Sequence, residues 1–301
     1  MKKKSNILLF LLTISAFILK GQQTAQFSNY LVNYFGQNPA AMGLNRCVDI
    51  KFGGKLQWLG FEGAPHYYFF SVTTPILKKN YSKVRHYAGG YILLDNQHIF
   101  SSTYIKLAYS LHHRISRGWY AGYGIFGGIK QVSVANIVSD PAINGAALHY
   151  PDLMPGIIFY NSKTMLGLGI EHIIPKRIKS LDNGRFRNQY YFTGSKKIEG
   201  GNYHDYMLSF NLKWGYLAPP ALDLNAMLIK NKFNLGLGYR VGEAIILQLR
   251  FRINTLIIAY AFDFPLNRKR WFTTNSHELI LGFSKCGSPQ DKEEYFCPAY
   301  Q

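Results

Sequence analysis

The glycine-rich run at residues 122–127 (GYGIFG) is the part of this sequence that comes nearest to a chemical motif. It matches G-x-G-x-x-G, which lets a backbone approach the pyrophosphate of a dinucleotide when it follows a strand and opens a helix. Residues 119–132 instead have the character of one continuous strand. We therefore interpret these glycines as small residues on an inward strand face, where something packs closely.

Titratable residues stand close together in two places, His112-His113 and His277-Glu278. Adjacent residues of a strand point to opposite faces, so neither pair converges on one ligand. The sequence contains no H-E-x-x-H and no G-x-S-x-G motif. We expect no catalytic residue, no metal site and no cofactor, and hence no enzyme. A lumenal hydrolase built from dispersed residues is the weakest alternative left open.

The chain has three cysteines, Cys47, Cys286 and Cys297. No C-x-x-C pair occurs, so the cysteines do not predict a zinc site. In an oxidising compartment Cys286 and Cys297, which are close together in the tail, could form a disulfide. That pairing leaves Cys47 over, and free thiols are the other interpretation.

The composition mixes apolar and polar residues throughout the chain. Hydrophobic residues make up 48% of the sequence, yet the mean hydropathy is only −0.08. The net charge of +18 comes from 34 basic and 16 acidic residues. These charges do not gather on one helix or patch, which argues against a nucleic-acid partner. We interpret the basic balance as an adaptation to an anionic lipid surface.

The first residues of the chain predict export. Lys2–Lys4 form a basic start, and residues 7–19 form an apolar run that is too short to span a bilayer. Gly21 is a small residue at which cleavage could fall. We predict a cleaved signal peptide at residues 1–21. No later apolar run is long enough for a helical membrane span.

The rest of the sequence alternates apolar and polar residues with a period of two. Between residues 244 and 253, apolar side chains at odd positions alternate with polar ones at even positions, apart from Ile246. Burying so many polar side chains in a dry core would cost roughly several kcal/mol each, whereas a wet or hydrogen-bonded lumen accommodates them. We count fourteen such strands, at residues 47–58, 65–76, 86–95, 101–112, 119–132, 151–161, 164–174, 187–196, 205–214, 221–230, 232–242, 244–253, 255–264 and 276–285.

This pattern predicts an all-β fold, a single antiparallel transmembrane β-barrel of the outer membrane. An even strand count puts both ends on the periplasmic side, with short turns there and longer loops outside. We therefore expect a periplasmic N-terminal segment at 22–46, a barrel at 47–285 and a periplasmic tail at 286–301. The longest connections, at 133–150, 175–186 and 265–275, all follow odd-numbered strands.

Basic residues recur at the polar positions of several strands. They predict a positively charged lumen, which would favour anions if the barrel were a passive pore. This pore is the alternative to a binding role. The residues concerned are Lys106, Lys213, Arg240, Arg250 and Arg252.

The segment 58–65 (WLGFEGAP) is a short aromatic hairpin between the first two predicted strands. One interpretation is a turn with girdle aromatics. The other is a docking surface for a second protein, because exposed aromatic side chains make good anchors. In that case the contact residues would be Trp58, Gly60, Phe61, Glu62 and Pro65.

Several segments together are similar to one known family. They are Gln26-Phe27-Ser28-Asn29-Tyr30, Asn38-Pro39-Ala40-Ala41 with Gly43, the stretch 57–65, Asp223-Leu224-Asn225, residues 235–240 (LGLGYR), Tyr260-Ala261-Phe262-Asp263 and Ser276-His277-Glu278-Leu279. Through them the mature chain resembles the PorP/SprF family of type IX secretion proteins from Bacteroidetes. Taken singly, only the stretch 58–65 is specific.

The resemblance implies an integral outer-membrane protein that supports type IX secretion or gliding motility. Its implied partners are the C-terminal domain of a cargo adhesin, other type IX secretion components and a periplasmic, peptidoglycan-associated protein. The family carries over no catalytic residue. The basic loop at 175–186 and the cysteine tail depart from the family pattern, so the resemblance does not name the particular partner.

Overall fold

The computed structural model describes residues 25–76, 84–98, 100–134, 147–174, 187–201, 204–215, 218–266 and 275–285. These residues form fourteen strands. The strands are β1 (Val48–Leu56), β2 (His66–Pro75), β3 (Val84–Gln97), β4 (Phe100–Ser116), β5 (Trp119–Val134), β6 (Leu148–Tyr160), β7 (Thr164–Glu171), β8 (Gln189–Glu199), β9 (Asp205–Gly215), β10 (Ala218–Lys230), β11 (Phe233–Arg240), β12 (Ala244–Ile253), β13 (Leu256–Pro265) and β14 (Ser276–Lys285).

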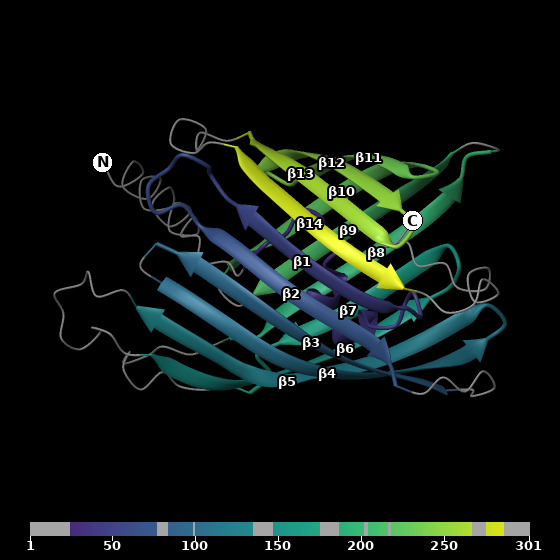
Figure 1. The fold of residues 1–301 in the computed structure, drawn as a ribbon, viewed down its shortest axis with the longest axis horizontal. Helices are drawn as coiled ribbons and strands as arrows, with labels where there is room; N and C mark the ends of the chain where they lie inside the picture. The colour runs from purple at the N-terminus through teal and green to yellow at the C-terminus, as the bar shows by residue number, and fades with distance from the viewer. Residues whose placement is uncertain are drawn as a thin grey trace, which may run out of the picture.

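The strands close into one antiparallel barrel in which each pairs with its neighbours in sequence. The barrel closes where β1 pairs with β14. In this pairing Val48 lies opposite Lys285 at one end, and Leu56 lies opposite His277 at the other. In Figure 1 the strands run obliquely and β1 lies beside β14. The predicted fold class is therefore confirmed, including the strand count.

The two faces of the wall differ as the period of two predicts. In β4, Ile105 and Leu107 point outward, and 72% of Leu107 is exposed, whereas Lys106 and Ser110 point inward and are buried. The eight residues of β11 alternate strictly between exposed and buried. An exposed apolar face around a closed sheet is what a bilayer requires, because hydrocarbon offers backbone groups no hydrogen bonds.

Several tight turns between strands depend on residues that tolerate a left-handed backbone. Asn231 between β10 and β11 has φ 50°, Asn254 between β12 and β13 has φ 54°, and Gly118 between β4 and β5 has φ 82°. All three turns follow even-numbered strands and lie at the same end of the barrel as the Lys285 end of β14. This end is called the short-turn rim below.

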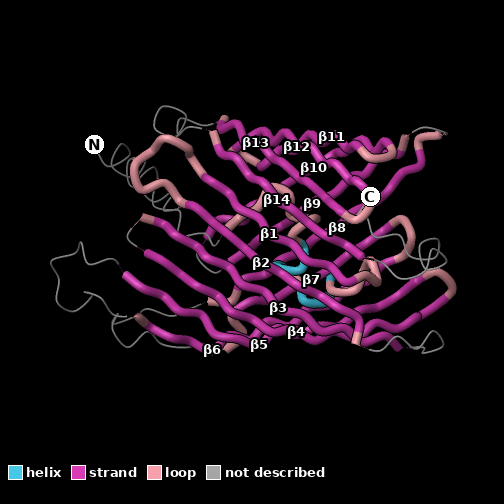
Figure 2. Tube along the Cα trace, viewed as in Figure 1, coloured by secondary structure: helices cyan, strands magenta, loops and turns pink. Residues whose placement is uncertain are grey.

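Residues 25–47, the N-terminal segment, lie inside the barrel. The segment contains one short helix, α2 (Tyr34–Gln37), and one 3-10 turn, η1 (Pro39–Ala41), which Figure 2 shows in cyan between the strands. Most of its side chains are buried against the wall. The expected separate periplasmic segment at 22–46 is thus wrong for its described part, because apolar and hydrogen-bonding side chains of the segment find partners within the lumen.

Some predictions fall outside the described residues. These are the signal peptide at 1–21, the tail at 286–301, and most of the three long connections that follow odd-numbered strands. Within the described ranges, no helix is long and apolar enough to cross a membrane.

Candidate functional site

Glycines in the wall let the N-terminal segment approach the backbone of the strands. A Cβ at Gly124 of β5 would lie 2.4 Å from both the Pro39 carbonyl carbon and the Ala40 nitrogen. A Cβ at Gly127, on the opposite face of the same strand, would meet nothing within 4 Å. The glycine-rich run is thus a strand and not a nucleotide loop. The interpretation as inward-facing small residues holds for Gly124 and is wrong for Gly127, which faces outward.

Asn38 joins the segment to two strands beside this contact. Its side-chain amide donates hydrogen bonds to the Ile157 carbonyl of β6 at 3.0 Å and to the Leu168 carbonyl of β7 at 3.3 Å. Its side-chain oxygen accepts from the Ala40 amide at 2.9 Å and so begins η1. A cap of this kind satisfies backbone donors that a helix leaves open at its start.

Tyr30 attaches the segment to a further strand of the wall, β9. Its hydroxyl donates to the Ser209 hydroxyl of β9 at 2.8 Å. Burial raises the pKa of the Tyr30 phenol above its ordinary value, and the hydrogen bond with Ser209 opposes that shift only in part. The phenol therefore stays neutral and remains a donor across the physiological range.

A dense polar group surrounds the start of the segment. This Ser28 cluster consists of Ser28, Lys55 of β1, Asp223 of β10, Arg240 of β11, Asp263 of β13 and Glu278 of β14. All six residues are buried. Two cations face three carboxylates. Hydrogen-bond donors of the segment must therefore offset part of the cost of burying the excess negative charge.

Glu278 binds the backbone of the segment directly. One of its oxygens accepts from the Ser28 amide at 2.6 Å, and the other accepts from the Asn29 amide at 2.9 Å. Gln248 of β12 donates to the Ser28 carbonyl at 2.7 Å. The wall thus satisfies consecutive backbone groups that would otherwise be buried without partners.

Asp263 links the Ser28 side chain to both cations. It accepts from the Ser28 hydroxyl at 2.7 Å, from the Lys55 ammonium at 2.7 Å and from the Arg240 guanidinium at 3.1 Å. Arg240 also makes a two-pronged contact with Asp223, at 2.8 and 3.2 Å. Charge-assisted bonds of this geometry fix orientation as well as contributing energy.

A second buried group, the Lys106 cluster, joins the strands on the other side of the barrel. It consists of Lys106 of β4, Asp152 of β6, Glu171 and His172 at the end of β7, and Tyr191 of β8. The Lys106 ammonium lies 2.6 Å from Glu171 and 2.9 Å from Asp152. The Tyr191 hydroxyl donates to Glu171 at 2.8 Å.

Asp152, Glu171 and His172 are residues of the kind that bind a metal ion, and their ligand atoms lie within 4.8 Å of one another. The Lys106 ammonium already contacts both carboxylates. A cation entering this cluster would have to displace a buried ammonium group. The geometry therefore fits an ion-pair network that holds the wall.

The five basic residues predicted for the lumen lie on inward strand faces. Lys106, Lys213, Arg240 and Arg250 are buried, and Arg252 is half-buried. Lys106 and Arg240 contact carboxylates, and Lys213 donates to the Ala25 carbonyl of the segment at 3.5 Å. Two cavities beside the segment measure only about 30 and 10 Å³, about the space of one water or less.

The β1–β2 turn, residues 57–65, projects from the rim opposite the short turns. Leu59 and Phe61 are 51% and 52% exposed, and Gly60 and Glu62 are also exposed, whereas Trp58 and Pro65 are half-buried. Leu59, which the sequence-based contact set left out, thus offers more apolar surface than Trp58. Sequence pattern alone could not show that Trp58 is half-buried and Leu59 exposed.

Hydrogen bonds make this turn a fixed structure. The Gln57 amide donates to the Pro65 carbonyl at 2.9 Å and closes its base. The Phe61 amide donates to the Trp58 carbonyl at 3.1 Å, and the Leu59 amide donates to the Asn275 carbonyl beside β14 at 3.0 Å. A partner that binds the exposed Leu59 and Phe61 side chains would therefore not have to order the turn, so binding would cost little conformational entropy there.

Cys47, which the sequence analysis left unpaired, is disulfide-bonded. Because the chain has only three cysteines, a disulfide between Cys286 and Cys297 cannot form at the same time. Cys286 and Cys297 themselves lie outside the described residues. The predicted Cys286–Cys297 pair thus lies outside what the structure describes, and Cys47 is the described cysteine that forms a disulfide.

Comparison with known proteins gives the family. The family described as type IX secretion system membrane protein PorP/SprF matches residues 19–283. This chain belongs to the PorP/SprF family. With its closed barrel and apolar outer face, it is an outer-membrane component of the type IX secretion system. No curated protein matches it.

Solved structures that resemble this PorP/SprF protein share its fold. The Ralstonia pickettii toluene transporter TbuX has a TM-score of 0.52 and 10% identity, covering 89% of this chain and 96% of that one. A mutant of the monoaromatic hydrocarbon channel TodX has a TM-score of 0.52 and 7% identity over 89% and 97% of the two chains. The channel CymD has a TM-score of 0.51 and 8% identity over 89% and 95%.

The segments that carry the PorP/SprF resemblance meet in the lumen. Ser28 comes from the first segment. Its partners Arg240, Asp263 and Glu278 come from three others, and Asp223, which binds Arg240, comes from a fourth. Ser28 and the three carboxylates were not among the predicted site residues, and Arg240 was predicted only as a lumen charge. Two sequence features could have identified the carboxylates as a site. They occupy inward-facing positions of their strands, and they lie in the segments that carry the family resemblance.

Proposed function

We propose that this PorP/SprF protein supports export or surface anchoring of a partner adhesin by binding it, and not by conducting solutes. The observation that carries this proposal is the occupied lumen. The N-terminal segment is held through buried bonds to strands on both sides of the barrel, including Glu278 of β14 and the carbonyls of Ile157 and Leu168. A lumen filled in this way favours a binding and assembly role over the passive-pore alternative.

The β1–β2 turn is the proposed contact surface. It follows an odd-numbered strand, so it faces the cell exterior if the short turns face the periplasm, as in other barrels with an even strand count. Its exposed apolar side chains, Leu59 and Phe61, stand on a hydrogen-bonded base. Aromatic side chains such as Phe61 are enriched at protein interfaces, and Leu59 adds apolar surface beside it. The expected partner is the C-terminal domain of the adhesin.

The test replaces Leu59 and Phe61 together by Ala and recovers the tagged barrel from detergent-solubilised outer membranes. We expect the wild-type barrel to bring down a large adhesin, and the double variant to lose at least about tenfold of it. Phe233→Ala is the matched control, because Phe233 is an exposed aromatic at the other rim, 38% exposed.

Equal recovery of adhesin by the double variant and the control would remove the turn from the interface. Recovery of only peptidoglycan-associated partners would move the binding role to the periplasmic side. A wild-type barrel without any partner would contradict the binding role, and conductance would then become the leading hypothesis.

A further inference from the structure

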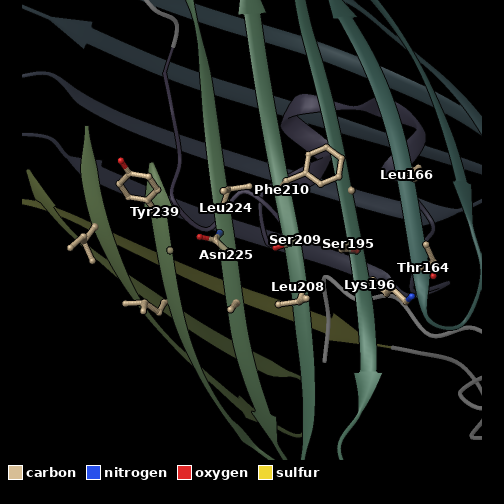
Figure 3. A pocket seen from close by; sticks show the side chains of 15 residues that line it. Thr164, Leu166, Ser195, Lys196, Leu208, Ser209, Phe210, Leu224, Asn225 and Tyr239 are labelled. Carbon is tan, nitrogen blue, oxygen red and sulfur yellow. The ribbon is translucent and has the colours of Figure 1, made fainter. Parts of the chain in front are cut away.

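The outer wall over β7–β12 contains a large apolar groove. Its volume is about 790 Å³, within the range of small-molecule sites. The groove belongs to the outward face of the strands and so opens toward the hydrocarbon of the membrane. Figure 3 shows its lining side chains from outside, with part of the N-terminal segment behind the strands.

Strand register arranges the lining in two parallel rows. One row follows the paired residues Thr164, Lys196, Leu208, Ala226 and Leu237, and the other follows Leu166, Gly194, Phe210, Leu224, Tyr239 and Ile245. Thr164 begins β7 at the short-turn rim, whereas Tyr239 is the second-last residue of β11 at the opposite rim. The groove therefore crosses the apolar wall from one rim toward the other.

Small residues keep the groove open along these rows. A Cβ at Gly194 would lie 2.4 Å from the Phe210 ring and 2.9 Å from the Leu166 side chain. The Phe210 ring therefore lies against the wall in the place that a side chain at 194 would take. Ala226 leaves a similar gap between Leu208 and Leu237 in the other row.

A single cation marks the short-turn end of the groove. Lys196 is exposed there beside Thr164, and its side chain has no ion pair with any described residue. Its neighbours differ: Lys163 pairs with Glu199 at 2.8 Å, and Lys197 pairs with Asp205 at 2.6 Å. An uncompensated ammonium at the membrane rim attracts an anionic group.

We propose that this groove binds one phospholipid of the periplasmic leaflet, with its phosphate on Lys196 and an acyl chain between the two rows. The apolar body of the groove and the cation at its rim match the two parts of such a lipid. A partner strand could not be added here, because the closed sheet has no free edge. An acyl chain needs no hydrogen bonds, and the groove offers almost only apolar surface. The proposal does not depend on the adhesin-binding role.

Two variants separate the parts of this site. Lys196→Glu reverses the charge at the rim, and Ala226→Trp fills the groove. Lys232→Glu is the control for charge, because Lys232 is exposed in the β10–β11 turn at the same rim. Leu281→Trp is the control for bulk, because Leu281 is exposed on the outward face of β14. Slower migration after heating in detergent gels checks that each variant is folded.

The measurement is native mass spectrometry of the full-length barrel, purified in a mild detergent, together with phosphorus analysis of extracted lipid. We expect one retained phospholipid per wild-type barrel and per control. We expect at least about tenfold less in Lys196→Glu and in Ala226→Trp.

Absence of bound phospholipid from the wild type would overturn the proposal, as would equal retention in Ala226→Trp. Loss in Ala226→Trp without loss in Lys196→Glu would overturn the assigned phosphate contact. A wild-type dimer that Ala226→Trp dissociates, without bound lipid, would assign the groove to a second copy of the chain.

Discussion

The two buried polar clusters of this barrel contain similar residues but hold different things. The Ser28 cluster receives backbone and side-chain groups of the N-terminal segment, through Glu278, Asp263 and Gln248. The strong bonds of the Lys106 cluster join strand to strand, from β4 to β6, β7 and β8. A buried polar network can therefore serve either to attach a filling segment or to fix the wall itself.

The two clusters also differ in where their charges find partners. In the Lys106 cluster, an ammonium lies between two carboxylates, and His172 contacts one of them at 2.9 Å. Carboxylates outnumber the ammonium and guanidinium groups in both clusters. The additional donors of the Lys106 cluster, the Tyr191 hydroxyl and the His172 ring, belong to the wall, whereas those of the Ser28 cluster include amides of the segment. The first cluster can be complete without the segment, whereas the second cannot.

The largest effect is expected from Lys106→Met. This change leaves Asp152 and Glu171 buried without their shared ammonium, so it should destabilise the folded barrel by about 3–5 kcal/mol. Urea titration of the refolded barrel in detergent measures the loss. Lys163→Met is the control, because the Lys163–Glu199 pair is exposed and should contribute about 0–1 kcal/mol. Equal effects of the two changes would contradict a wall-holding role for the Lys106 cluster.

Glu278→Ala should destabilise the barrel wall less than Lys106→Met does. Its main effect should be to loosen the N-terminal segment. It leaves the Ser28 and Asn29 amides buried without acceptors, at about 1–3 kcal/mol for each group. Hydrogen exchange should therefore accelerate at residues 28–30 and remain slow in β4–β8. Single-channel recording should detect conductance in this variant and none in the wild type. Faster exchange throughout the wall would instead make Glu278 a general stability residue.

A pair of glycine variants should give a moderate effect. Gly124→Ala places a methyl group 2.4 Å from the backbone at Pro39 and Ala40, and the overlap should cost about 1–3 kcal/mol. Gly127→Ala, on the outer face of the same strand, meets nothing and should be neutral or slightly stabilising. Thermal unfolding of both variants in detergent measures the difference. A neutral Gly124→Ala would mean that the segment can withdraw from the wall at no cost.

The smallest effect is expected from reducing the disulfide at Cys47, the last residue of the N-terminal segment. Val48 pairs with Lys285, and Cys286 follows Lys285 in sequence, so we expect the disulfide to join Cys47 and Cys286. Peptide mapping without reduction identifies the pair. Because β1 and β14 are already paired beside it, reduction should speed exchange only near Val48 and Lys285. A bond from Cys47 to Cys297 would contradict this assignment.

Local sequence pattern was sufficient for the barrel wall. In residues 244–253, alternation alone predicted the strand, its bounds and the outward direction of its apolar side chains, and β12 has those bounds. Alternation works because successive residues of a strand face opposite sides, and an apolar face must meet the membrane. The same rule placed Lys106 and Arg240 on the inward face.

The contents of the lumen were decided only by the tertiary structure. Residues 25–47 have no strand alternation that would place them, and their partners are distant in sequence: Ser28 and Glu278 are 250 residues apart. Which carboxylate meets which cation also depends on register around the closed sheet, which no local pattern contains. The sequence thus determined the wall and its two faces, while closure of the barrel determined what fills it.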